Sequence, residues 1–310
     1  QSLVFINRRG YAPVLICKSC AWTAACHRCA ARLVVHLREK KLRCHHCGHQ
    51  ERFPPACPHC GDQDLAPFGH GTQRVEAALS ERFPGARILR IDRDSIRRKD
   101  AWQAMLKDIQ EQRVDILVGT QILAKGHDFP NLSLVGILNS DASLYSTDFR
   151  AAERLFAQLM QVAGRAGRAE IAGEVLIQTE FPDHPLYHAL RRHDYAALAQ
   201  TLLAERKMAG FPPFVYQALL RAEAPQVATA LDFLTDAAAL APVATSKNVE
   251  VFEPVPAQMA RLKGLERAHL LVQSGSRKKL QEFLAVWRPK LATLPARKLR
   301  WSLDVDPLEF

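Results

Sequence analysis

All eight cysteines of this 310-residue chain lie between positions 17 and 60, in pairs with the spacing C-x-x-C. A C-x-x-C step places two thiolates on one tight turn, in the arrangement that a tetrahedral metal ion requires. Two such turns complete a site of four thiolates, so the pattern predicts two structural zinc ions with no open position for a catalytic water. The pairs are Cys17/Cys20, Cys26/Cys29, Cys44/Cys47 and Cys57/Cys60.

Other uses of cysteine fit this pattern less well. A disulfide framework implies an oxidising compartment, and the first residues do not have the charged and then apolar composition of a signal peptide. A redox C-x-x-C motif normally occurs singly, near a βαβ unit. Iron–sulfur ligation is chemically possible, but the clustered spacing of ferredoxins is absent. Zinc is therefore the favoured metal, and an iron–sulfur centre is the alternative.

The spacing between the pairs bears on which cysteines share an ion. Fourteen residues separate Cys29 from Cys44, enough for the hairpin of a zinc ribbon, whereas only five separate Cys20 from Cys26. The spacing favours a nested arrangement, and an arrangement of neighbouring pairs stays open. In the nested arrangement an inner ion is bound by Cys26, Cys29, Cys44 and Cys47, and an outer ion by Cys17, Cys20, Cys57 and Cys60.

Composition limits the class of protein. Apolar residues make up 48% and charged residues 24% of the chain, as in a packed globular protein, and the length predicts two domains. No run approaches the roughly 18 uncharged apolar residues of a membrane span. The net charge of +10 is concentrated in residues 1–70 and 263–300, with surpluses of six and eight positive charges. These basic zones fit a polyanionic partner, and composition alone fits solvated surface charge equally well.

After Pro67 the hydrophobic pattern alternates between strands and helices. The expected strands are 88–91, 115–118, 132–138 and 174–178, and the expected helices are 72–83, 99–112 and 150–163. Short strands are also expected before the cysteines, at 2–6 and 13–16. The alternation predicts an α/β fold, in which a parallel sheet has helices on both faces and the cysteine-rich segment is an insertion. Such sheets bind ligands in the loops beyond the carboxyl ends of their strands.

Two segments expected in such loops carry the most specific motifs. One is G-T-Q-I-L-A-K-G-H-D-F-P, which begins at Gly119 after a strand, and the other is Q-V-A-G-R-A-G-R, which begins at Gln161 after a helix. Arg165 and Arg168 are flanked by glycines, which allow close approach of the backbone, and their two guanidinium groups can bind one phosphate group. Taken alone, a G-R-x-G-R sequence is also compatible with an ordinary surface loop.

A new unit begins where Phe211-Pro212-Pro213-Phe214 interrupts the pattern. The expected order is strand 215–223, helix 225–240, strand 249–253, strand 267–273, helix 277–293 and strand 299–305. This β-α-β-β-α-β order predicts a small ferredoxin-like α+β domain. Its basic residues fit a phosphate-binding face, and Trp287 or Trp301 either stacks on a base or packs in the core.

The motifs carry a resemblance to known proteins. Residues 67–210 resemble the second RecA-like lobe of a superfamily 2 helicase. The whole chain resembles the C-terminal portion of the PriA family, the bacterial replication-restart (primosomal protein N-prime) helicases. Besides the lobe, this resemblance rests on the start Asn7-Arg8-Arg9-Gly10-Tyr11, the four C-x-x-C pairs and the segment Glu205–Phe214. The domains that this implies are the lobe at 1–16 and 67–210, the zinc-binding insertion at 17–66 and an α+β domain at 211–310.

The resemblance implies roles for individual residues. The residues expected to be catalytic are Gln161, Arg165 and Arg168. Of these, Arg165 and Arg168 are expected to reach the γ-phosphate of ATP and to stabilise the transferring phosphoryl group. Those expected near the nucleotide are Gly126 and Asp128. Those expected to contact DNA are Thr120, Gln121 and Lys125.

The activity implied is an ATP-dependent 3′-to-5′ DNA helicase that remodels stalled or abandoned replication forks and initiates primosome assembly. The implied partners are branched and single-stranded DNA, single-stranded-DNA-binding protein and other primosome proteins, and no membrane. The implied cofactor is ATP with Mg²⁺. The implied location is the cytoplasm, at the bacterial nucleoid. The chain has no G-x-x-x-x-G-K-[ST] loop and no Asp-Glu pair after a strand. We therefore expect the triphosphate to be held mainly by a first lobe upstream, and this chain alone to be inactive.

Two other functions stay open at this point. One is a non-catalytic, zinc-dependent module for nucleic-acid binding or assembly, in which the arginine pair only binds phosphate. The other is an RNA-remodelling motor of the same superfamily.

Overall fold

The computed structural model divides the chain into two compact units, Gln1–Pro13 with Gly69–Leu202 and Val14–Phe68 with Leu203–Phe310. The residues that it describes are 1–7, 14–28, 32–36, 40–44, 47–68, 72–92, 95–96, 99–120, 123, 129, 131–141, 144, 148–167, 172–242 and 248–309.

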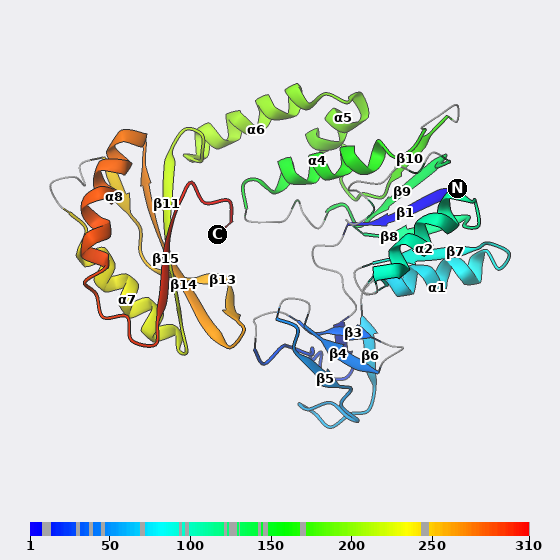
Figure 1. Ribbon diagram of the computed structural model, residues 1–310, viewed down its shortest axis with the longest axis horizontal. Coiled ribbons are helices and arrows are strands. Elements are labelled where there is room, and N and C mark those ends of the chain that lie inside the picture. Colours follow the sequence, from blue (N-terminus) through cyan, green and yellow to red (C-terminus); the bar gives the residue numbers. More distant parts are fainter. Residues whose placement is uncertain are drawn as a thin grey trace. The chain divides into compact units, whose positions relative to one another are not determined.

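The first unit is built on a five-stranded parallel sheet with the strand order β10-β9-β1-β8-β7 (Figure 1). Its central strand, β1, pairs in parallel with β8, where Leu3 lies opposite Leu117, and with β9, where Leu3 lies opposite Val135. The prediction of a parallel α/β sheet is confirmed. The strands are β1 (Ser2–Ile6), β7 (Ile88–Ile91), β8 (Ile116–Gly119), β9 (Leu134–Leu138) and β10 (Glu174–Ile177).

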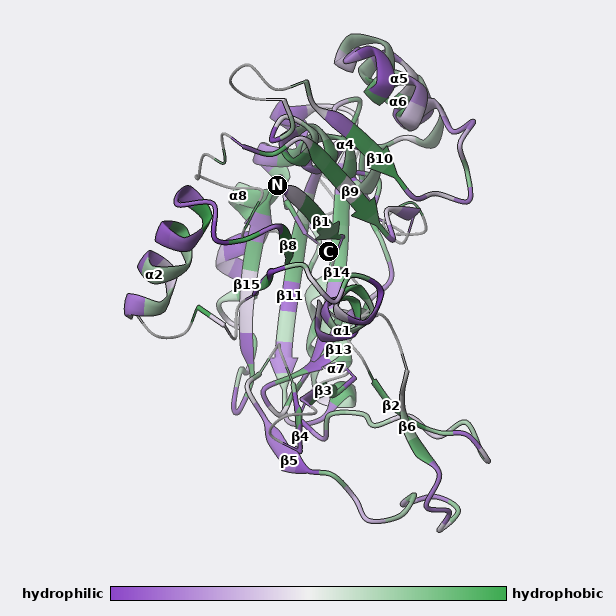
Figure 2. Ribbon diagram, turned by 90° about the vertical axis from the view of Figure 1, so that its right-hand side faces the viewer, coloured by the Kyte–Doolittle hydropathy of each residue, from purple (hydrophilic) through white to green (hydrophobic). Residues whose placement is uncertain are grey.

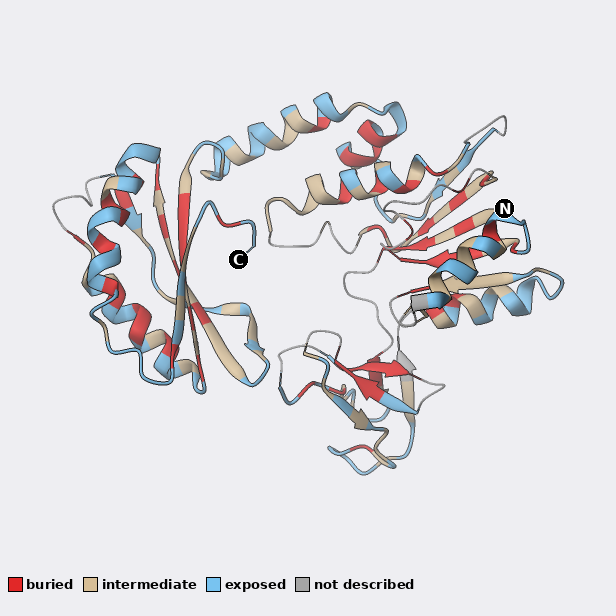
Figure 3. Cartoon of the chain, in the orientation of Figure 1, coloured by how far each residue is buried: buried red, intermediate tan, exposed pale blue. Residues whose placement is uncertain are grey.

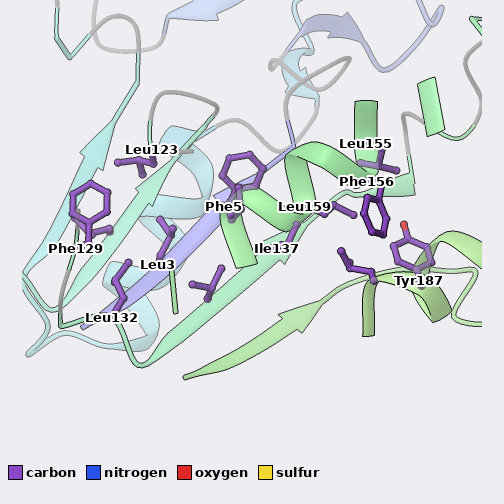
Figure 4. Close-up of a cluster of buried hydrophobic side chains, with 14 of the residues drawn as sticks. Leu3, Phe5, Leu123, Phe129, Leu132, Ile137, Leu155, Phe156, Leu159 and Tyr187 are labelled. Atoms are coloured by element: carbon purple, nitrogen blue, oxygen red, sulfur yellow. The ribbon is translucent and has the colours of Figure 1, made fainter. Parts of the chain in front are cut away.

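Successive side chains of β1 point to opposite faces of the sheet and pack into two hydrophobic cores, one on each face. Leu3 and Phe5 are buried in the larger core, whereas Val4 and Ile6 belong to the smaller core on the opposite face. The larger core is completed by α2 and α4, as Figure 4 shows for Leu155 and its neighbours on α4. The smaller core is completed by α1. Because both faces are covered, β1 and β9 are apolar along most of their length (Figure 2), and the centre of the sheet is buried (Figure 3).

Two helices that follow the sheet were not predicted from the sequence. The first, α5, begins with Pro185 after His184, whose Nδ1 accepts a hydrogen bond from the N–H of Leu186 at 3.1 Å. A capping acceptor followed by proline at the first helical position is a local signal for a helix start. The helices of this part of the chain are α1 (Thr72–Arg82), α2 (Lys99–Gln110), α4 (Ala151–Ala163), α5 (Pro185–Arg192) and α6 (Tyr195–Ala209).

The cysteine-rich segment forms an antiparallel sheet with the order β5-β4-β3-β2-β6. Its small core contains Leu15, Leu33 and Leu42, which are fully buried. The strand expected at 13–16 is β2, and it pairs with β3 and β6, so it belongs to this sheet and not to the parallel one. The strands are β2 (Val14–Cys17), β3 (Val34–His36), β4 (Lys41–Arg43), β5 (Gln50–Arg52) and β6 (Leu65–Phe68).

The C-terminal part is an antiparallel sheet with the order β12-β14-β11-β15, and both of its helices pack into the same core on one face. This is the predicted ferredoxin-like arrangement. An additional strand, β13, pairs only with β14 and was not predicted. The elements are β11 (Tyr216–Ala224), α7 (Val227–Ala239), β12 (Val249–Val251), β13 (Val255–Leu262), β14 (Leu265–Ser274), α8 (Arg277–Leu291) and β15 (Arg300–Val305).

Both tryptophans of this part belong to its core. Trp287 is fully buried, its ring packs against Phe283, and its Nε1–H donates to the carbonyl oxygen of Ala237 at 2.9 Å. Trp301 stacks on Phe233 with ring centroids 6.3 Å apart. Of the two roles considered for these residues, core packing is therefore confirmed for Trp287, and Trp301 packs against the same core.

We predict that Trp287→Ala lowers the free energy of unfolding by about 3–5 kcal/mol, because it removes a large buried side chain and leaves the carbonyl of Ala237 without its donor. Chemical denaturation of the chain, followed by circular dichroism, measures this change. The matched control is Val286→Ala, which alters an exposed neighbour on the same helix and should change stability by less than about 0.5 kcal/mol. Equal effects of the two substitutions would contradict the placement of Trp287 in the core.

Candidate functional site

The first cysteine cluster lies where the cysteine-rich segment begins and ends. The Sγ atoms of Cys17, Cys20, Cys57 and Cys60 all lie within 4.8 Å of one another, with Cys17–Cys60 and Cys20–Cys57 distances of 3.6 Å. Cys17 is the last residue of β2, which pairs with β6, so the two ends of the segment are adjacent. The structure thus brings the first and fourth C-x-x-C pairs together.

The second cluster lies beside the hairpin of β3 and β4. The Sγ atoms of Cys26, Cys44 and Cys47 lie within 4.8 Å of one another, and Cys26 and Cys47 are 3.7 Å apart. Cys29, expected as the fourth ligand, lies outside the described residues. The antiparallel hairpin joins the second and third pairs in the manner expected of a zinc ribbon.

The donor set fits zinc. Tetrahedral coordination with Zn–S bonds of about 2.3 Å places sulfur atoms about 3.8 Å apart, close to the distances in both clusters. These distances are far longer than a disulfide bond of about 2.05 Å, and no disulfide joins the described cysteines. When bound, zinc would cross-link segments that are distant in the sequence, and four sulfur ligands would leave no position open for a substrate.

The cysteine thiols differ in acidity, but not by cluster, because the pKa is raised for Cys26 in the second cluster and for Cys60 in the first. Burial raises the pKa of the Cys26 thiol to about 12. Burial also acts to raise the pKa of Cys57, but backbone N–H groups of Cys60 and His59 donate to its sulfur and lower that pKa to about 7. Because the metal binds thiolates, uptake of zinc by either cluster must release protons, and the zinc affinity should fall as the pH falls.

Polar residues gather at the carboxyl edge of the parallel sheet. Each of β1, β7, β8 and β9 is followed within two residues by a buried polar side chain. The connection from β1 to β7 runs toward one edge of the sheet and the later connections run toward the other, and open α/β sheets bind ligands where such a reversal occurs. The four buried residues are Asn7, Asp92, Thr120 and Ser140.

Thr120, a residue expected to contact DNA, begins the loop after β8. The glycine before it is required by close packing: a Cβ at Gly119 would lie 2.4 Å from Cδ1 of Leu123 and 2.7 Å from the carbonyl oxygen of Ile91. The N–H of Leu123 donates to the carbonyl oxygen of Thr120 at 2.9 Å. The other residues expected to bind ligands in this loop lie outside the described residues, namely Gln121, Lys125, Gly126 and Asp128.

The second motif lies at the opposite edge of the sheet. The N–H of Gly167 donates to the carbonyl oxygen of Leu132, just before β9, at 3.0 Å. A Cβ at Gly173 would lie 2.2 Å from the nitrogen of Gly167, so the two glycines pack backbone against backbone. The expectation that both motifs lie beyond the carboxyl ends of strands is therefore wrong for this one. The reason is that α4 leaves the carboxyl edge after β9 and returns the chain to the amino edge, where β10 begins.

The residues of this motif differ in exposure. Arg165 follows the end of α4 and its side chain is buried, with only 9% of the residue exposed, whereas Gln161 is exposed. Arg168 lies outside the described residues. Burial holds the Arg165 guanidinium in a defined position, which reduces the entropy that it would lose on binding a phosphate group.

Sequence reasoning missed a charged network after β7. Asp92 accepts hydrogen bonds from Oγ1 of Thr72 at 2.9 Å and from Nη1 of Arg90 at 2.6 Å. Arg90 also pairs with Glu76 on α1 at 3.0 Å. The network ties the start of α1 to the end of β7, near the loop that carries Thr120. The only signal in the sequence is an aspartate directly after an apolar strand.

A second missed network follows β9. The carboxylate of Asp141 accepts hydrogen bonds from the hydroxyls of Thr179 and Tyr187, each at 2.6 Å, and from the N–H of Glu180 at 2.7 Å. Burial acts to raise the pKa of this carboxyl group, but the three donors outweigh it and the pKa is lowered. The network fixes the carboxyl end of β9 to α5, which carries Tyr187.

Three known families match parts of this chain. Residues 26–52 match the PriA DNA helicase Cys-rich region domain, residues 66–170 match the helicase conserved C-terminal domain, and residues 207–308 match the primosomal protein N C-terminal domain. The first two matches cover the second cysteine cluster, Thr120 and Arg165.

Curated proteins match over nearly the whole chain. The replication restart protein PriA of Haemophilus influenzae is 44% identical over 308 residues, which are 99% of this chain and 42% of that protein. The proteins of the same name from Bacillus subtilis and Synechocystis are 37% and 38% identical, over 99% of this chain and 38% and 37% of their own lengths. The chain therefore spans about two fifths of the length of these relatives.

We predict that Cys44→Ser removes one of two zinc ions per chain, because Cys44 is a buried member of the second of the two cysteine clusters. Elemental analysis by plasma mass spectrometry measures the zinc content. The control is His59→Ala, which alters an exposed residue in the loop of the first cluster and should leave both ions bound. Iron in place of zinc, or two zinc ions retained by the Cys44 variant, would contradict the assignment.

We predict that Asp141→Asn destabilises the chain by about 2 kcal/mol at pH 7, because an amide cannot accept all three hydrogen bonds of the carboxylate. The pKa of Asp141 is lower in the folded state, so its contribution is present above the unfolded pKa of about 3.9 and is lost as the pH falls through the folded value. Urea denaturation at several pH values measures the difference between the two proteins. The control is Asp183→Asn, at an exposed side chain, and a difference that does not shrink at low pH would refute the argument.

Proposed function

This chain belongs to the PriA family of replication restart proteins, and we propose that it is the C-terminal part of an ATP-dependent 3′-to-5′ DNA helicase that remodels stalled replication forks and initiates primosome assembly. The observation that carries this proposal is the 44% identity to a replication restart protein over 99% of the chain. The match to the helicase conserved C-terminal domain, on a parallel sheet of the expected kind, supports the motor part of the proposal.

We assign the motor residues as follows. Arg165 and Arg168 would stabilise the charge that develops on the transferring γ-phosphoryl group of ATP, with Gln161 beside them. The Mg²⁺ that accompanies ATP would be held outside this chain, which spans about two fifths of its relatives. The residues proposed at the nucleotide are Gly126 and Asp128, and those proposed at the DNA are Thr120, Gln121 and Lys125.

We propose that the two zinc ions brace the cysteine-rich segment. This segment has few fully buried side chains, and a small core of this kind is usually supplemented by a metal or by disulfides. The proposed ligands are the four cysteines of the first cluster for one ion, and Cys26, Cys29, Cys44 and Cys47 for the other. The segment would then be a rigid platform for DNA or for primosome proteins.

Strand pairing supports a division of the chain into domains. Because β2 and β6 belong to the antiparallel sheet, we propose that the zinc-binding insertion extends over residues 14–68, slightly beyond the expected 17–66. The helicase lobe would comprise residues 1–13 and 69 to about 210, and the α+β domain the remainder.

Basic side chains support DNA as the partner. In the C-terminal part, exposed lysines and arginines form two sets, one at the start of α8 and one just before and at the start of β15. Contacts with single-stranded-DNA-binding protein and other primosome proteins, and a cytoplasmic location at the nucleoid, are proposed from the family alone. Within the described residues, no helix has the length and apolar character needed to cross a bilayer. The exposed basic residues are Arg277, Lys278, Lys279, Arg297, Lys298 and Arg300.

In the full-length protein, we predict that Arg168→Ala reduces DNA-stimulated ATP hydrolysis by about 1,000-fold or more, with zinc content and DNA affinity retained. A coupled ATPase assay with forked DNA, together with fluorescence anisotropy for DNA binding, measures both properties. The matched control is Arg191→Ala, which removes an exposed arginine on α5 and should leave hydrolysis unchanged. This chain on its own should hydrolyse ATP negligibly.

The alternative functions predict different outcomes of the same experiment. A non-catalytic binding module requires that Arg168→Ala weakens DNA binding and leaves hydrolysis at the wild-type level. An RNA-remodelling motor requires stronger stimulation of hydrolysis by RNA than by forked DNA. Either result would overturn the proposal.

A further inference from the structure

The hairpin of β13 and β14 ends in a tight two-residue turn. Leu262 pairs with Leu265, and between them Lys263 and Gly264 have φ angles of 53° and 86°. Two consecutive positive φ values are typical of a type I′ turn, which matches the right-handed twist of a hairpin. Arg261, at the base of this turn, is oriented by an ion pair with Glu266 at 2.7 Å.

The tip of this hairpin contacts the loop between Cys26 and Cys29. The N–H of Gly264 donates to the carbonyl oxygen of Arg28 at 2.8 Å, and Nη1 of Arg261 donates to the carbonyl oxygen of His27 at 3.1 Å. Leu262 packs against the small core that contains Cys26 and Cys44. Two hydrogen bonds and one apolar contact therefore join the C-terminal part to the second cysteine cluster.

One peptide unit takes part in both interactions. The N–H of Arg28 donates to Sγ of Cys26 at 3.4 Å, and the carbonyl of the same peptide unit is that of His27, which accepts from Arg261. In a planar trans peptide the N–H and C=O point in opposite directions, so orienting the N–H toward the sulfur presents the carbonyl to the arginine. A metal-bound thiolate would hold this orientation and polarise the peptide further, because hydrogen bonds to charged groups are stronger.

We propose that residues 261–264 are a docking element for the second cysteine cluster, such that retention of zinc in this cluster and docking of the C-terminal hairpin stabilise each other. The coupling is reciprocal: the hairpin holds the metal-binding loop in its bound conformation, and the metal holds the loop's carbonyls where the hairpin needs them. The first cluster provides an internal comparison. Among the described residues, no hydrogen bond joins its loop at Pro58 and His59 to the C-terminal part.

The experiment compares zinc retention by the two clusters in the complete 310-residue chain. The variants are Arg261→Met, which removes the hydrogen bond to His27 together with the ion pair to Glu266, and Leu262→Ala, which removes the apolar contact. The control is Lys263→Gln, which alters the exposed residue between Leu262 and Gly264 in the same turn. The zinc-loaded proteins are treated with a chelator and iodoacetamide, and the alkylation rate of each cysteine is followed by peptide mass spectrometry.

We expect Cys44 and Cys47 to be alkylated on the order of 5-fold faster or more in both variants, with Cys57 and Cys60 unchanged and the control like wild type. Unchanged rates at Cys44 and Cys47 would overturn the proposal. Equal acceleration at both clusters would also overturn it, because that result indicates general loosening of the unit.

Hydrogen exchange tests the reciprocal effect in the wild-type chain. Removal of zinc should accelerate exchange of the Gly264 amide by a comparable factor, while amides between β11 and β15 keep their rates. Exchange at Gly264 that does not respond to zinc would refute the coupling. Neither measurement involves DNA or ATP, so the result is independent of the proposed helicase function.

Discussion

The antiparallel pairing of β2 with β6 is the constraint on which the cysteine-rich segment depends. Val14 lies opposite Phe68 and Cys17 opposite Leu65, so the chain enters and leaves the segment side by side. The inserted segment therefore acts on the parallel sheet as a long loop with adjacent ends. Because lengthening a loop costs little additional entropy, the insertion is compatible with β1 remaining in its sheet. Cys17 is both the end of β2 and a member of the first cluster, so a metal there would fasten the base of the insertion.

Elements with two buried faces or a strong helical period were predictable from the sequence. Of the elements that were missed, α5 has a buried helical face and a local start signal that the sequence analysis did not use, whereas α6 and β13 lack such features. α6 has only Leu198 fully buried, so its apolar residues do not form a clear stripe. β13 contains Pro256, pairs with one neighbour and shifts register along its length, and proline within a short apolar run argues against a strand. In α6 and β13 the local sequence pattern does not favour one secondary structure over another, and tertiary contacts determine which one forms.

In the candidate site, too, some features could be predicted from a local sequence pattern and others depend on tertiary contacts. C-x-x-C spacing directly encodes a local turn, so the sequence indicated which cysteines are neighbours, and hairpin geometry then brings the distant pairs together. The networks around Asp92 and Asp141 have no such local pattern, because their partners lie on other strands and helices. The position of Arg165 also depended on topology: a motif after a helix returns to the amino edge of the sheet, whereas a motif after a strand, such as Thr120, stays at the carboxyl edge.

Two clusters of the same chemistry thus have different structural surroundings. The first lies at the base of the insertion, where it adds to a β-ribbon that already joins the two ends. The second lies at the hairpin of β3 and β4, where the peptide between His27 and Arg28 faces a sulfur on one side and the C-terminal part on the other. A metal in the first cluster therefore acts mainly on the closure of its own segment. A metal in the second would orient a peptide whose carbonyl accepts a hydrogen bond from Arg261 of the C-terminal part, so the two metals would have different structural roles.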